Sequence, residues 1–81
     1  MKIKQYTNAH DLASDIAKEM TRQFADSKFV EFDYDRFEKP GDIRFLFILE
    51  GLEIELYYST LVERYETIED FVKAFKNATT R

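Results

Sequence analysis

The apolar positions between Asn8 and about Asp26 recur at intervals of three and four residues. This spacing places the apolar side chains on one stripe of a helix, which a buried helix requires. Asn8 is a suitable N-cap, and Asp11 suits the positive end of the helix dipole. The predicted stripe comprises Ala9, Leu12, Ala13, Ile16, Ala17, Met20 and Phe24.

Before this helix, the segment from Met1 to Tyr6 alternates Ile3 with Lys2 and Lys4. They fit either a short extra strand or an arm that packs Ile3 and Tyr6 on the core. We favour the arm.

From Lys28 onward the period changes to two, which is typical of a half-buried strand. In this first strand Val30, Phe32 and Tyr34 share one side, and Glu31, Asp33 and Asp35 share the other. The segment from Glu38 to Asp42 is a predicted turn because Pro40 presets φ and Gly41 accepts a positive φ.

Two further strands follow the turn. Ile43 to Leu49 is apolar except for Arg44, as expected of a strand with neighbours on both edges, and Leu52 to Tyr58 alternates strictly. Glu50 and Gly51 between them predict a tight hairpin.

A second long helix begins after Thr67, which acts as its cap, with Asp70 at the third helical position. Its apolar stripe is Ile68, Phe71, Val72 and Phe75, and we expect it to end near Asn77. For Ser59 to Glu66 the sequence leaves three alternatives open: a continuation of the third strand, a turn, or a packed loop.

A two-residue loop at Glu50 and Gly51 sets the pairing of the second and third strands. On one side it predicts the pairs Leu49–Leu52, Phe47–Ile54, Phe45–Leu56 and Ile43–Tyr58. That side forms the core, in which we expect Phe45, Phe47, Ile54 and Leu56 to oppose Ile16, Met20, Phe71 and Phe75.

The opposite side of the same register combines acidic and apolar residues. Ile48 pairs with Glu53, Leu46 with Glu55, and Arg44 with Tyr57. Aligning Tyr34 with Phe45 adds Glu31 beside Ile48, Asp33 beside Leu46, and Asp35 beside Arg44.

These elements predict an α+β fold for residues 1–81 as a single domain. The order is α-β-β-β-α, and the three strands form an antiparallel meander. Because both apolar helix stripes need the same sheet face, the architecture is a two-layer sandwich with both helices on that face.

Composition narrows the class of protein. The chain has no Cys, which excludes disulfides and thiolate metal sites, and this favours the cytoplasm. It contains neither a signal-peptide pattern nor a membrane-length apolar run. A net charge of −4 argues against direct nucleic-acid binding, since phosphate contacts need a basic patch.

The sequence offers little support for catalysis or for a bound cofactor. The carboxylates on the outer side could attract a hard cation, but ligands on a flat sheet do not surround an ion, so we favour a solvated acidic surface and expect no metal. Paired carboxylates would need a cleft that raises one pKa. His10 is the only histidine, and in the first helical turn we favour an ordinary surface or capping role over that of a general base. No nucleophile elbow, Walker loop or dinucleotide motif occurs, so we expect a protein that is not an enzyme.

The segment from Ile68 to Asn77, taken with the order of elements, small size and acidic balance, resembles phage-encoded anti-CRISPR proteins, especially small acidic inhibitors of Cas9. The resemblance implies a non-enzymatic inhibitor whose carboxylates stand in for DNA phosphates in a basic groove of a nuclease. This chain differs in carrying its acids mainly on strands, and no site residue transfers by position.

The leading hypothesis is a protein-interaction module whose acidic sheet face engages a basic surface on a nucleic-acid-handling protein, such as a CRISPR effector in the host cytoplasm. The residues that would bind this partner are Glu31, Asp33, Asp35, Leu46, Ile48, Glu53, Glu55 and Tyr57. The alternative is a homodimer or assembly subunit that buries Leu46 and Ile48 against a second chain.

Overall fold

The computed structural model describes residues 2–24, 31–36, 42–49 and 51–79. Three α-helices and a three-stranded antiparallel sheet make up this part of the chain, so the predicted α+β class is confirmed. In chain order the elements are η1 (Ile3–Gln5), α1 (Ala9–Gln23), β1 (Glu31–Arg36), β2 (Ile43–Leu49), β3 (Leu52–Tyr57), α2 (Tyr58–Arg64) and α3 (Ile68–Thr79).

Helix α1 begins where the sequence predicts. The side-chain oxygen of Asn8 accepts a hydrogen bond of 2.8 Å from the backbone N–H of Asp11, which satisfies one of the free donors at the helix start. Leu12, Ile16 and Met20 are buried, as their spacing requires. The interior stripe of α1 is therefore the predicted one.

The N-terminal segment is an arm that packs on the core. It contains a single 3-10 turn, in which Ile3 is fully buried, and Tyr6 packs against the core from one side. The backbone N–H of Ile3 donates to the carbonyl oxygen of Glu66 at 2.9 Å. The described part of this segment does not form the alternative, an extra strand; its β pairing consists of one isolated bridge between Lys2 and Thr67.

The sheet has the order β1-β2-β3 and the predicted register. Tyr34 lies opposite Phe45 in the first hairpin, and Leu49 lies opposite Leu52 in the second. Gly51 has a φ of 83°, a left-handed conformation that glycine adopts without steric cost. Of the predicted turn from Glu38 to Asp42, residues 38–41 lie outside the described residues, as do Val30 and Glu50.

Residues 58–64 form helix α2, so the three alternatives for this segment were wrong, and so was the pair Ile43–Tyr58. The physical reason lies in Asp42, just before β2. Its carboxylate accepts hydrogen bonds from the backbone N–H of Ser59 at 3.1 Å and from Ser59 Oγ at 2.8 Å. This carboxylate, which is distant in sequence, accepts from donors in the first turn of α2. Leu61 of the same helix is buried in the core.

Helix α3 begins after Thr67, as predicted. Thr67 Oγ1 accepts a hydrogen bond from the backbone N–H of Asp70 at 3.2 Å, and Phe71 and Val72 are buried. The helix extends to Thr79, slightly beyond the expected end near Asn77.

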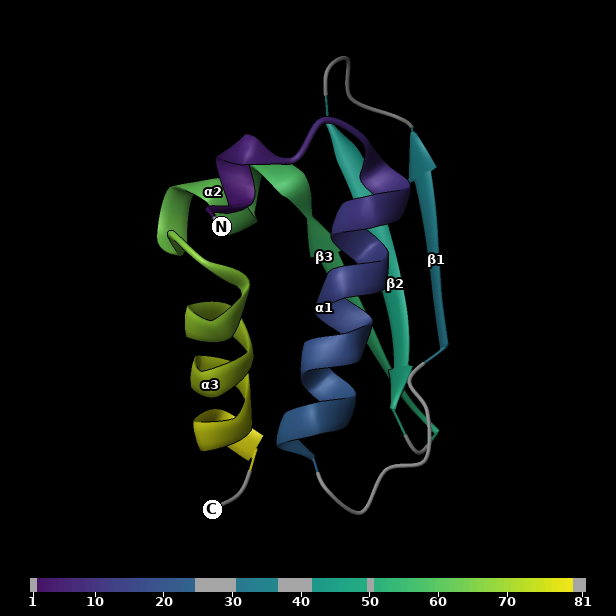
Figure 1. Ribbon diagram of the computed structural model, residues 1–81. Coiled ribbons are helices and arrows are strands. Elements are labelled where there is room, and N and C mark those ends of the chain that lie inside the picture. The colour runs from purple at the N-terminus through teal and green to yellow at the C-terminus, as the bar shows by residue number, and fades with distance from the viewer. Residues whose placement is uncertain (1, 25–30, 37–41, 50, 80–81) are drawn as a thin grey trace.

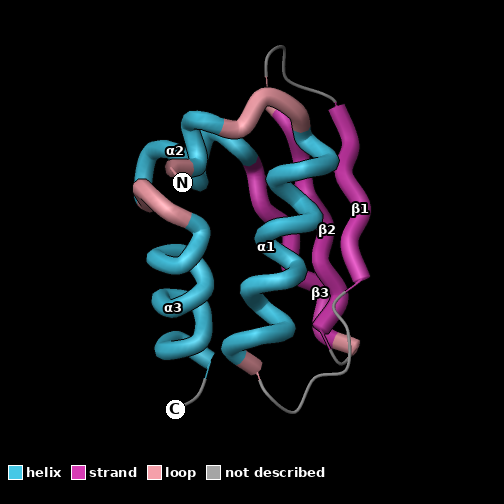
Figure 2. The backbone as a smooth tube through the Cα atoms, viewed as in Figure 1, coloured by secondary structure: helices cyan, strands magenta, loops and turns pink. Residues whose placement is uncertain are grey.

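The helices lie on one face of the sheet (Figures 1 and 2). Helix α1 packs over β1 and β2, and α3 packs against α1 on the side of β3. Phe45 and Phe47 of β2 are fully buried, with ring centroids 6.4 Å apart. Ile16, Met20 and Phe71 belong to the same core cluster, whereas Leu56 and Phe75 lie at its partly buried margin.

We predict that Phe47→Ala destabilises the fold by about 3–5 kcal/mol, because it removes a fully buried ring from the centre of the core. Urea denaturation measures the loss. Ile48→Ala is the matched control, since Ile48 is the next residue of β2 and points to the opposite face, where we expect a clearly smaller effect. A loss below about 1 kcal/mol for Phe47→Ala would contradict this account of the core.

Candidate interaction face

The side of the sheet turned away from the helices carries the sequence-predicted site. We call it the outer face and define it by Asp33 of β1, Arg44, Leu46 and Ile48 of β2, and Glu53, Glu55 and Tyr57 of β3. The register places the backbones of Glu31 and Asp35 beside Ile48 and Arg44, while their side chains lie outside the described residues. Three strands thus bring the predicted positions to one surface.

Leu46 and Ile48 form the apolar centre of the outer face. Both side chains are half-buried, yet neither belongs to the core cluster nor to the apolar residues packed against it. Their neighbours across the strands shield them in part. The helices lie on the other face of the sheet (Figure 1), and neither residue packs against the core that those helices cover.

Exposed carboxylates frame this centre on both sides. Asp33 lies opposite Leu46 on β1, whereas Glu53 and Glu55 lie opposite Ile48 and Leu46 on β3. All three acidic residues are exposed. The outer face therefore combines a small apolar strip with a negative border.

The basic side chain of Arg44 partly neutralises the negative charge of this border. Arg44 Nη1 lies 3.1 Å from Glu55 Oε2, and the two side chains are 37% and 50% exposed. An ion pair this open to water contributes little to stability. The sequence predicted the Arg44–Tyr57 pairing but missed this contact, although Glu55 is the diagonal neighbour of Arg44 in the predicted register.

The outer face does not form a metal site within the described residues. In these ranges no group of three or more His, Asp or Glu side chains is arranged to hold a metal ion. The carboxylates stand along a flat surface instead of converging.

A second polar cluster lies between α1 and α3. It includes Tyr6, Asp15 and Glu19 around a depression of about 260 Å³. Burial and the hydrogen bond that Tyr6 donates to Asp15 raise the pKa of the Tyr6 phenol above its usual range. Hydrogen bonds from Arg22 hold the pKa of Glu19 below its ordinary value, and Gln23 adds another at 2.7 Å.

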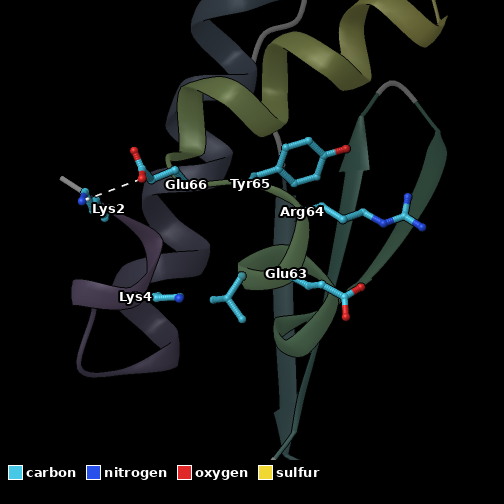
Figure 3. A pocket seen from close by; sticks show the side chains of 7 residues that line it. Lys2, Lys4, Glu63, Arg64, Tyr65 and Glu66 are labelled. Carbon is cyan, nitrogen blue, oxygen red and sulfur yellow. Dashed lines mark ion pairs between the residues drawn. The ribbon is translucent and has the colours of Figure 1, made fainter.

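A depression of about 280 Å³ lies between the N-terminal arm and α2 (Figure 3). Lys2 pairs with Glu66 at 3.8 Å on one side, while Glu63 and Arg64 extend away from Lys4 on the other. Positive and negative side chains are mixed around it, and the lining residues that the structure describes contain no pairing of a nucleophile with a general base.

His10 lies on the surface of α1, as predicted. Its ring contacts Phe32 and Tyr34 of β1, with centroid distances of 5.9 and 6.0 Å. Through these contacts His10 packs α1 against β1 at the edge of the sheet.

Comparison with protein-family models, curated proteins and solved structures gives no match. None of the helices in the described ranges has the length and apolar character needed to cross a lipid bilayer.

We predict that Arg22→Ala raises the pKa of Glu19 toward its ordinary value. Because the folded-state pKa is lowered, ionised Glu19 stabilises the fold at neutral pH. That contribution disappears as the pH falls below about 4.3 and through the folded-state value. NMR titration of the Glu19 carboxyl carbon measures the shift, with Lys18→Ala on the same helix as the control. An unchanged Glu19 pKa in Arg22→Ala would contradict the assigned cause.

Proposed function

We propose that this protein is a non-enzymatic interaction module that binds a basic surface of another protein through its outer face. One observation carries the proposal: Leu46 and Ile48 form an apolar strip, bordered by exposed carboxylates, that no described helix covers. An apolar centre with a charged border is how protein-binding surfaces are commonly built.

The charge of the border favours a cationic partner. Asp33, Glu53 and Glu55 project from the same side of the sheet, and the chain as a whole carries a net charge of −4. Such a surface attracts a basic protein at a distance and orients it on approach. Leu46 and Ile48 would then supply contact area that is less sensitive to salt.

The ion pair between Arg44 and Glu55 adds a condition for specificity. A partner cation that approaches Glu55 competes with Arg44, which is already 3.1 Å from that carboxylate. The partner must therefore bind the other carboxylate oxygen of Glu55, offer an acceptor to Arg44, or leave the pair intact and engage Asp33 and Glu53. Because Arg44 repels an unaccompanied cation, a uniformly basic surface fits less well than one with an acceptor at this point.

The partner class that we propose is a nucleic-acid enzyme with a phosphate-binding groove, such as a CRISPR effector nuclease. Carboxylates two residues apart on a strand are about 7 Å apart and form a regular row of negative charge. Lysine and arginine side chains that bind phosphate groups also bind carboxylates. The protein would then act as an inhibitor of phage or mobile-element origin that occupies the groove in place of DNA, in the cytoplasm of the host.

We predict that the triple variant Asp33→Asn, Glu53→Gln, Glu55→Gln loses inhibition of a purified Cas9-type nuclease while it keeps its fold. The substitutions preserve side-chain size and remove three negative charges. The readouts are DNA cleavage and direct binding at low and high salt, and we expect wild-type affinity to fall steeply as salt increases.

The matched control is Glu63→Gln, Glu66→Gln, Glu69→Gln, which removes the same charge from exposed helical and linking positions away from the outer face. Loss of binding in both variants would indicate a general charge effect. Equal binding by wild type and the outer-face variant would refute the proposed function.

A second candidate function is self-assembly through the same apolar strip, because no described helix covers Leu46 and Ile48. If this is correct, the unmodified protein sediments as a dimer and Leu46→Ser, Ile48→Ser converts it into a folded monomer. A monomer at high micromolar concentration would exclude this candidate.

A further inference from the structure

The two edges of the sheet differ in a way that the proposed function does not use. β2 lies in the middle, so β1 and β3 each have one side without a strand partner among the described residues. The backbone N–H and C=O groups on such a side can pair with an added strand.

The hairpin determines which residues of β3 direct their backbone groups to its open edge. Leu49 and Leu52 flank the two-residue loop, so they form the closing pair and exchange hydrogen bonds. Because this pattern alternates, Ile54 also bonds to β2. The N–H and C=O groups of Glu53 and Glu55 therefore point away from β2, toward the open edge.

The edge of β1 is already occupied. By the same alternation the N–H of Tyr34 points outward, and it donates to Asp33 Oδ1 at 2.8 Å. The ring of His10 also packs against Phe32 and Tyr34 from α1. Because the Asp33 carboxylate already accepts from the Tyr34 N–H and α1 packs beside this edge, β1 is a poor site for a fourth strand.

Within the described ranges the edge of β3 has neither obstacle, and its side chains favour a particular sequence. Glu53 and Glu55 are exposed on the outer face, whereas Leu52, at 53% exposure, and the half-buried Leu56 lie on the helix side. An added strand would place alternate residues next to each of these two sets.

We propose that the open edge of β3 binds an extended segment of the partner protein in which basic and apolar residues alternate. This inference rests on the proposed function and specifies how the partner engages it. Basic side chains would lie beside Glu53 and Glu55, while apolar ones would lie beside Leu52 and Leu56. The backbone groups of Glu53 and Glu55 would form the ladder to the new strand.

A second copy of this chain fits the edge less well than such a segment. In an antiparallel pair of β3 strands centred on Ile54, Glu53 of each copy would lie opposite Glu55 of the other. Like charges directly opposite each other destabilise a strand pair. Charge therefore selects a basic strand over the chain's own β3.

The probe for the test is a short capped peptide of alternating Lys and Val, added to the full-length protein. We expect slowed amide hydrogen exchange and large amide shifts at Glu53 and Glu55, with little change at Phe32 and Tyr34. A peptide of alternating Glu and Val is the charge control and should not bind. Formation of a homodimer in place of peptide binding, or equal protection of both edges, would overturn the inference.

Two substitutions at one position separate backbone pairing from charge. Glu55→Pro removes an N–H that faces the open edge, which an edge strand tolerates. Glu55→Gln removes the charge and the Arg44 ion pair but keeps the N–H. We expect Glu55→Pro to bind the peptide about tenfold more weakly than Glu55→Gln. Circular dichroism checks that Glu55→Pro folds, and the exchange measurement on the unmodified protein needs no variant.

The outcomes distinguish the two proposals. If the outer-face charge variant loses nuclease binding but Glu55→Pro binds the nuclease as well as Glu55→Gln does, the outer face is functional and strand addition is wrong. If the outer-face charge variant binds like wild type, the proposed function itself fails.

Discussion

The packing of the two inward-pointing phenylalanines of β2 against α1 is the interaction on which the remaining structure depends. Phe45 and Phe47 are fully buried in the middle strand. Because side chains alternate along a strand, this contact also directs Leu46 and Ile48 to the opposite side. The core and the outer face are consequences of one register. A shift by one residue would bury glutamates of β3 and expose its leucines.

The sequence predicted the sheet well because its register depends on local features. Gly51 supplies the conformation of a two-residue loop, and alternation on both sides of it fixes each pair from Leu49–Leu52 to Arg44–Tyr57. The long helices were predictable for a similar reason, since Asn8 and Thr67 lie next to the helices that they cap. In these cases the determining contact is close in sequence to the element that it determines.

Helix α2 could not be predicted from neighbouring residues, because the contact that stabilises its first turn comes from a residue distant in sequence. Asp42 provides the acceptor for Ser59 and precedes it by 17 residues. The strict alternation of β3 also continues into Tyr58, so the local pattern favoured a longer strand. The same difference applies to the outer face. The sheet register, which the sequence predicted, determines which residues lie on it. The Arg44–Glu55 ion pair and the hydrogen bond from the Tyr34 N–H to Asp33 depend on side-chain rotamers, which the sequence pattern does not specify.

The contact between α1 and α3 joins opposite ends of the chain. Lys76 Nζ donates to the carbonyl oxygen of Gln23 at 2.8 Å, and its ammonium lies 6.0 Å from the centroid of the Phe24 ring. During synthesis on the ribosome, α1 and the whole sheet are made before the helix that covers the side of α1 next to β3. The nascent chain therefore keeps part of its apolar surface open to solvent or to chaperones until α3 has left the ribosome, and the native core closes only then.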